Sequence, residues 1–362
     1  MPKITHIHAL DGLRGIAALM VMFFHFNWQS FNFSLINKVA VFGQTGVDLF
    51  FVLSGFLITR ILIFTKENHS NNFFYNFYIR RALRIFPLYY GFLILVYFVL
   101  PLFKIDNTPP LSNQLWYYLY LQNIPATFTD LNLQSSGPGH FWSLAVEEHF
   151  YLFWPLLVYF MPSKRLLWAS LGIILLALVI RIILLTHNIG VFYFTLCRFD
   201  ALAMGSLLAY LEYKNDLSIY RKYFVNIGIS SFVLLLITWR FTGGQGLDFI
   251  GTLKFTIIAL FYLCVVGYIS IEKHQTIIHK IVSNPLLGFT GKISYGLYVF
   301  HPLIFGIIGN QNLGFYVCIV ISILLTYLIA YLSYELYEKN FIKMKRYFED
   351  SKNLTIPKSN EP

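Results

Sequence analysis

The stretch LGFYVCIVISILLTYLIAYL, from Leu313 to Leu332, contains no charged side chain. A helix that crosses the hydrocarbon core of a bilayer needs about twenty mostly apolar residues, so this run predicts a membrane-spanning helix. The whole chain shares its character, because 57% of its 362 residues are apolar and only 12% are charged. Soluble proteins carry about 25% charged residues. The sequence therefore predicts an all-α, polytopic membrane protein.

Ten apolar runs along the chain are long enough to span a membrane. They cover approximately residues 8–28, 44–64, 85–103, 140–161, 166–186, 192–211, 223–240, 253–271, 291–309 and 313–334. We expect one transmembrane domain, 1–340, formed by a bundle of about ten helices. A short basic tail, 341–362, is expected to follow it in the cytoplasm.

Lysine and arginine residues indicate which side of the membrane each loop faces, since cytoplasmic loops are enriched in them. If the N-terminus is cytoplasmic, 19 of the 27 lysine and arginine residues fall in inner segments, while only Lys38 and Lys104 fall in outer ones. Both termini are therefore expected to be cytoplasmic. The positive charge follows from this topology, so it does not indicate a nucleic-acid partner.

The first span contains ionisable residues, which cost about 2.5–3.5 kcal/mol each at the centre of a bilayer and therefore suggest a function. Arg14 and His25 are eleven residues apart, so they share a helix face and lie about 16 Å apart along its axis. Asp11 precedes Arg14 by three residues and can pair with it. We expect Arg14 near the cytoplasmic side and His25 in the outer half.

The fourth span, GHFWSLAVEEHFYLFWP, places His140 and Glu147 on one helical stripe, with Glu148 rotated about 100° away. Glu147 would lie about 10 Å below His140, close to the depth inferred for His25. Such groups either form a site in a membrane cavity or make ion pairs that hold the bundle together. Further polar residues expected in the outer half, or just beneath it, are Asp48, Arg181, Arg198, Asp200 and His301.

Arg80, Arg81 and Arg84 lie at the start of the third span, in NFYIRRALRIFPLYY. Arginine forks match the geometry of phosphate groups, so the stretch suits the phosphates of a cytoplasmic cosubstrate. The alternative is an ordinary anchor to anionic lipid headgroups. We expect no metal, because neither the Glu147–His149 run nor His6-x-His8 has a metal-binding spacing of the H-E-x-x-H type.

Six stretches, in this order, resemble the integral-membrane acyltransferase-3 family. They are LDGLRGIAAL followed by His25, then GVDLFFVLSGFLI, RRALRIFPLYY, HFWSLAVEEHFYLFWP, RFDALAMG and GKISYGLYVFHP. The resemblance runs from about residue 5 to 340. It implies a multi-pass protein of the bacterial inner membrane that transfers an acyl group, expected to be acetyl, from cytoplasmic acyl-CoA. The acceptor would be a hydroxyl of an extracytoplasmic glycan such as lipopolysaccharide, capsule or exopolysaccharide.

The resemblance also suggests roles for the polar residues. His25 would be the general base, with Glu147 orienting its imidazole, while Arg14 and Asp11 would line or orient the donor path. The coenzyme A phosphates would bind Arg80, Arg81 and Arg84. The acceptor side would be formed by Asp48, His140, Trp142, Glu148, Arg198, Asp200 and His301.

Several alternatives stay open at this point. Trp142 either stacks on a sugar ring or anchors the helix at the membrane interface. His25 could itself carry the acyl group as a covalent intermediate. A transporter or flippase would also need a polar cavity in the membrane, and a non-enzymatic membrane scaffold would need none of these residues for chemistry.

Overall fold

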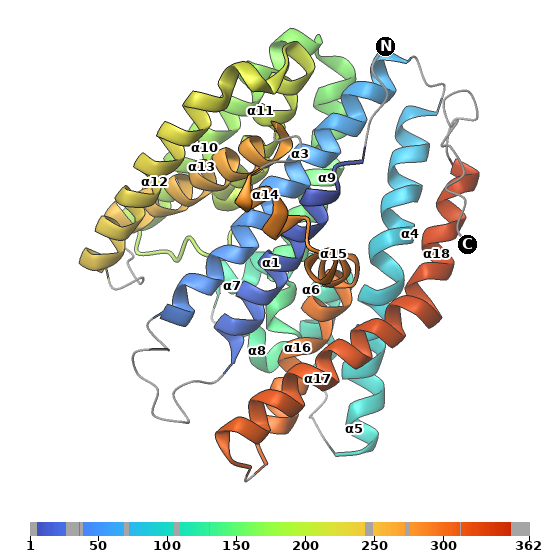
Figure 1. The fold of residues 1–362 in the computed structure, drawn as a ribbon. Helices are drawn as coiled ribbons and strands as arrows, with labels where there is room; N and C mark the ends of the chain where they lie inside the picture. Colours follow the sequence, from blue (N-terminus) through green and yellow to red (C-terminus); the bar gives the residue numbers. More distant parts are fainter. Residues whose placement is uncertain are drawn as a thin grey trace.

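The computed structural model describes residues 6–26, 36, 39–68, 72–104, 109–129, 131–242, 249–271, 276–311 and 313–348. Within these residues every regular element is a helix, which confirms the predicted all-α class. Figure 1 shows the long helices gathered in one bundle. They are α1 (His8–His25), α3 (Gly46–Glu67), α4 (Phe73–Ile94), α9 (Trp142–Phe160), α10 (Leu166–Thr186), α11 (Phe199–Lys214), α12 (Arg221–Thr242), α13 (Phe249–Ile271), α16 (Ser294–Gly309) and α17 (Phe315–Ser333).

Six helical stretches in the described residues are long and apolar enough to cross a membrane. They become seven if α15 (Pro285–Lys292) and α16, which are bent by 73°, count as one span. Helices α1 and α9 do not reach this measure because their ionisable residues lower the mean hydropathy, and α11 has only 16 residues. The structure thus supports a multi-pass membrane protein, while ten spans and cytoplasmic termini stay predictions.

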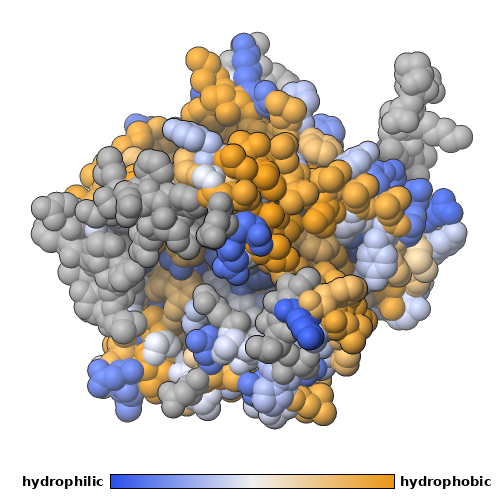
Figure 2. Space-filling model, turned by 90° about the horizontal axis from the view of Figure 1, so that it is seen from below, coloured by the Kyte–Doolittle hydropathy of each residue, from blue (hydrophilic) through white to orange (hydrophobic). Residues whose placement is uncertain are grey.

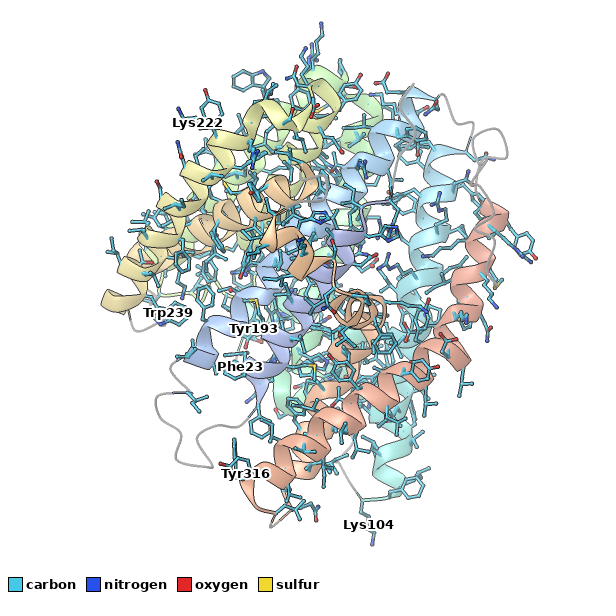
Figure 3. All side chains as sticks on the ribbon, in the orientation of Figure 1. Phe23, Lys104, Tyr193, Lys222, Trp239 and Tyr316 are labelled. Carbon is cyan, nitrogen blue, oxygen red and sulfur yellow. The ribbon has the colours of Figure 1, made fainter. Side chains whose placement is uncertain are left out.

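The outer surface of the bundle is largely apolar, as expected for a protein surrounded by lipid. Leu175 on α10, Ile229 on α12 and Leu324 on α17 are each about 60% exposed. Figure 2, which views the molecule from the lower end of Figure 1, shows many apolar side chains on that side. Lys222 and Lys104, which the sequence places on opposite sides of the membrane, lie at opposite ends of the bundle in Figure 3.

Helices α3 and α11 approach each other closely through two glycines. A Cβ atom on Gly55 would lie 1.9 Å from the Leu202 carbonyl oxygen, and one on Gly205 would lie 2.1 Å from the Val52 carbonyl oxygen. Small residues allow such close packing, which drives helix association in a membrane in place of the hydrophobic effect. This contact fixes the middle of the bundle.

Helix α1 is held by the chain around α14 (Ile277–Val282) and α15 in the same manner. A Cβ atom on Gly12 would lie 1.7 Å from the Val282 carbonyl oxygen, and one on Gly291 would lie 1.8 Å from the Asp11 carbonyl oxygen. The bend after α15 then directs α16 along α1. As a result, His301 at the middle of α16 faces His25.

The last helix continues beyond α17 through a π-helical turn, η8 (Tyr334–Glu338), into α18 (Lys339–Met344) and the 3-10 turn η9 (Lys345–Phe348). These elements pack against α4, as Figure 1 shows on the right of the molecule. Tyr337 donates a hydrogen bond to the Pro87 carbonyl oxygen at 3.2 Å. The end of the described chain therefore lies beside the start of α4.

We expect Gly55→Ala to destabilise the protein, because the added methyl group would force α3 and α11 apart. Overpacked helix contacts typically lose about 1–3 kcal/mol. The measurement is thermal unfolding of the purified protein in detergent. Gly172→Ala is the matched control, since a Cβ atom on Gly172 of α10 would have no neighbour within 4 Å among the described residues; equal melting of both variants would contradict the contact.

Candidate active site

A small pocket of about 100 Å³, here called the central pocket, lies between α1, α3, α4, α9 and α16. Arg14, Arg81, Arg84 and Glu147 line it, so three guanidinium groups face one carboxyl group. The Arg81 guanidinium lies 5.2 Å from the centroid of the Tyr151 ring. The pocket therefore has an excess of positive charge.

A second pocket of about 120 Å³, here called the arginine pocket, lies where α3 ends and α4 begins. Its charged lining consists of Arg80, Arg81, Arg84 and Lys345, and no acidic residue of the described chain lines it. Arg81 and Arg84 line the central pocket as well. The two pockets therefore meet at these two arginines.

A larger cavity of about 740 Å³, here called the outer cavity, lies towards the other end of the bundle, where α1 ends. Its lining comes from α1, α4 with its π-helical extension η3 (Leu95–Val99), the turn η4 (Gly139–Phe141) and α16. Gly137 has no room for a side chain, because a Cβ atom there would lie 2.2 Å from the Tyr97 hydroxyl. The loop can therefore lie against η3, and His25 and His140 face the space between them.

Three histidines meet at the wall of the outer cavity. His301 is fully buried, and its ring centroid lies 4.9 Å from that of His25 and 5.6 Å from that of His140. His301 Nε2 lies 3.2 Å from His25 Nδ1. The sequence suggested His301 as an acceptor residue, but the structure places it behind His25.

Backbone carbonyl groups determine where the protons of these rings lie. His25 Nδ1 is 3.0 Å from the Val21 carbonyl oxygen, and His301 Nδ1 is 3.0 Å from the Leu297 carbonyl oxygen. A carbonyl oxygen only accepts, so each Nδ1 carries the proton and each neutral ring keeps its lone pair on Nε2. The single Nδ1 hydrogen of His25 is therefore shared between two acceptors, the Val21 carbonyl oxygen and His301 Nε2, and the basic nitrogen of His25 is Nε2.

A hydrogen-bonded layer lies between the central pocket and the outer cavity. Tyr298 donates to the His140 carbonyl oxygen at 2.5 Å, and Ser143 Oγ lies 2.6 Å from the Tyr298 hydroxyl. Ser143 and Tyr298 line the central pocket, whereas His140 lines the outer cavity. A path between the two spaces would cross this layer.

The structure does not bring Glu147 to His25, as the expected pairing requires. Glu147 lines the central pocket with Ser54 and Tyr151, whereas His25 lines the outer cavity. The reason is depth: His140 itself lies at the level of His25, because both rings contact His301, and Glu147 is two helical turns further along the chain. Glu147 therefore belongs to the central pocket with Arg14.

Asp48, Arg198 and Asp200, expected on the acceptor side, form buried ion pairs. Arg198 Nη2 lies 2.6 Å from Asp48 Oδ1, and Arg181 Nη2 lies 2.8 Å from Asp200 Oδ2. The Arg198 guanidinium also lies 4.2 Å from the centroid of the Phe255 ring. All four side chains are almost completely buried, and none lines the three spaces above. They connect α3, α10 and α11, which agrees with the alternative that these residues form ion pairs that hold the bundle together.

Trp142 and Glu148 also lie away from the three spaces. Trp142 is 7% exposed and contacts Phe51 and Phe192. Its ring contacts aromatic side chains of the protein, and it lines none of the three spaces in which a sugar could bind. Glu148 has a buried oxygen, Oε1, with no hydrogen-bond partner among the described residues.

Asp11 pairs with Arg14, with 3.5 Å between the carboxylate and guanidinium groups, and also with His6 at 3.1 Å. The hydrogen bond to Asp11 raises the pKa of His6 above its usual range. His6, His8 and Asp11 each place one potential metal ligand within 4.8 Å of the others, a proximity that the spacing argument did not anticipate. Both histidines are exposed, and Asp11 is already engaged with Arg14.

Lys345 is the pocket residue that the sequence argument missed. It was counted among the basic residues of the tail, where positive charge needs no special explanation. Only the fold reveals its place, since it lies 261 residues beyond Arg84 and lines the same pocket. No local pattern in the sequence connects the two.

Comparison with known proteins agrees with this architecture. The family model described as "Acyltransferase domain", the acyltransferase-3 family, matches residues 7–335. The Staphylococcus aureus (strain COL) protein named "Putative O-acetyltransferase SACOL0978" is 31% identical over 94% of this chain and 58% of its own length. O-acetyltransferase OatA of Staphylococcus aureus (strain NCTC 8325 / PS 47) is 31% identical over 92% of this chain and 57% of its own length.

The chain thus spans a little over half the length of these curated relatives. No solved structure matches it. The family match nevertheless covers nearly all of the bundle, including every element that lines the three spaces except η9. The chain belongs to the acyltransferase-3 family.

Proposed function

We propose that this protein is a membrane acyltransferase that moves an acetyl group from cytoplasmic acetyl-CoA to a hydroxyl of an extracytoplasmic glycan. One observation carries the proposal: a basic pocket, a small central pocket and a histidine-lined cavity follow one another from one end of the bundle to the other. A donor and an acceptor on opposite sides of a membrane need such an arrangement. The relatives are named as O-acetyltransferases, which supports acetyl as the group transferred.

The donor side of the proposal rests on the basic lining of the arginine pocket. Four basic side chains line it, Arg80, Arg81, Arg84 and Lys345, and no acidic side chain does so among the described residues. Such groups bind phosphate oxygens through charge-assisted hydrogen bonds, so this lining suits a polyanion. Coenzyme A carries phosphates at one end and a long, thin pantetheine arm at the other, which suits a basic pocket joined to a narrow one.

The acceptor side rests on His25, whose Nε2 is free to take a proton. In the proposed reaction the acceptor hydroxyl gives its proton to Nε2 while its oxygen attacks the thioester carbonyl carbon. The new C–O bond forms, the C–S bond breaks, and the proton passes from His25 to the leaving thiolate. The imidazolium that forms is stabilised by His301, because His25 Nδ1 donates to His301 Nε2. His301 thereby takes the orienting role that the sequence suggested for Glu147.

For the thioester to reach His25, the donor arm must cross the Ser143–Tyr298 layer. The layer consists of hydrogen bonds among the Ser143 hydroxyl, the Tyr298 hydroxyl and the His140 carbonyl oxygen. Each typically contributes only about 0.5–1.5 kcal/mol net, so donor binding can open it. Arg14 and Glu147 would then flank the arm below the layer.

His25→Ala is expected to lower acyl transfer by about 10²–10⁴-fold, the usual contribution of a positioned acid–base group. The measurement is mass spectrometry of acylated surface glycan in cells that express equal amounts of each variant. His301→Ala should also reduce transfer, whereas His301→Gln should recover part of it by offering His25 Nδ1 an amide oxygen. His187→Ala is the control, since His187 is an exposed histidine at the end of α10. If His25→Ala acylated the glycan as well as wild type does, the catalytic role of His25 would be excluded. That is the result that a scaffold or a transporter predicts.

Arg84→Ala is expected to weaken coenzyme A binding by roughly 10–100-fold, because hydrogen bonds to charged groups contribute about 1.5–3 kcal/mol. The measurement is the rise in melting temperature of the purified protein on adding coenzyme A. Arg165→Ala, at the exposed turn before α10, should keep the full rise. If coenzyme A raised the melting temperature of Arg84→Ala as much as that of wild type, the arginine cluster at the start of α4 would be assigned to lipid headgroups.

A further inference from the structure

The arginine pocket has two ends, and different residues line them. Arg81 and Arg84 line both this pocket and the central pocket, so they lie at the junction. Arg80 and Lys345 line the arginine pocket alone, so they lie on its far side. The cations are therefore spread along a direction that leads away from the site of transfer.

This order matches the order of the charged groups in coenzyme A. The pantetheine arm joins the pyrophosphate, and the separate 3′-phosphate sits on the ribose beyond it. If the arm enters the central pocket, the pyrophosphate lies at Arg81 and Arg84. The 3′-phosphate then lies at the far side, beside Arg80 and Lys345. Phe73, Phe77 and Phe348 also line the pocket, so the adenine base would lie among aromatic side chains.

The size of the pocket indicates that its cover must move. Its volume is about 120 Å³, whereas sites for ligands of nucleotide size measure about 300–1,000 Å³. Two of its walls are the long helices α3 and α4, and the third is η9, a turn of four residues. This turn rests on the start of α4 through a contact between the Tyr75 and Phe348 rings, whose centroids are 5.9 Å apart. The turn is the wall that can shift at least cost.

We propose that the η9 turn closes over the nucleotide end of the donor and that Lys345, with Arg80, binds the 3′-phosphate. The inference rests on the proposed function, since it names the part of the acyl-CoA donor that this end of the site recognises. Lys345 is thus a specificity-determining residue, far in sequence from the arginines. It acts on donor binding and has no part in the acyl transfer step.

The test compares coenzyme A with 3′-dephospho-coenzyme A, by titration calorimetry of the purified full chain in detergent. Wild type should bind coenzyme A about 10-fold more tightly or better, the effect of one charge-assisted hydrogen bond. Lys345→Gln should bring the ratio of the two dissociation constants close to one while leaving the affinity for the dephospho compound unchanged. Lys345→Arg should keep the preference, because it keeps the charge.

Lys343→Gln is the matched control, since Lys343 lies two residues away, is exposed and does not line the pocket; its ratio should equal that of wild type. The inference would be overturned if the wild-type protein bound the two compounds equally tightly. It would also be overturned if Lys345→Gln kept the preference of the wild type for coenzyme A, a result that would assign Lys345 to lipid phosphates. In both cases the proposed function would stand, because both ligands still bind. Failure of wild type to bind either compound would instead overturn the proposed function and the inference with it.

Discussion

A charge inside a membrane must find its counter-charge within the protein, and this requirement organises the structure. Asp48 with Arg198, and Asp200 with Arg181, meet it and connect three helices. Breaking a buried ion pair leaves an uncompensated charge, so these pairs hold the bundle together. In the central pocket, Glu147 is the single carboxyl group of the described lining beside three arginines, and Asp11 pairs with Arg14 from outside that lining. In the proposed function, these guanidinium groups meet the anionic donor.

Periodicity and composition were sufficient to predict the helices, but not the positions of the helices relative to one another along the bundle axis. Apolar runs predicted the helices, and the eleven-residue spacing predicted that Arg14 and His25 share one face of α1. In the structure Arg14 lines the central pocket and His25 lines the outer cavity. The depth of Glu147 was wrong because a sequence does not show where the fourth span begins relative to the first. Two helices lie at a common level only through their packing, here through α16 and His301.

Long-range proximity was the other limit. Nothing near Lys345 distinguishes it from the other basic residues of the tail, and nothing near His301 reveals that a backbone carbonyl directs its lone pair to His25. The ion pairs were likewise left between two interpretations, since Arg198 has the same appearance in the sequence whether it meets a ligand or Asp48. Residue type suggested the candidate site residues, while only the structure showed which partners each of them has.

The unequal sizes of the spaces have a consequence for the proposed transfer. The central pocket, at about 100 Å³, is much smaller than the outer cavity, at about 740 Å³. In the proposed reaction the donor arm would fill the narrow space only after its walls move apart, whereas the wide space already has room for a sugar unit. Donor binding would therefore require rearrangement of the helices, and acceptor binding would not.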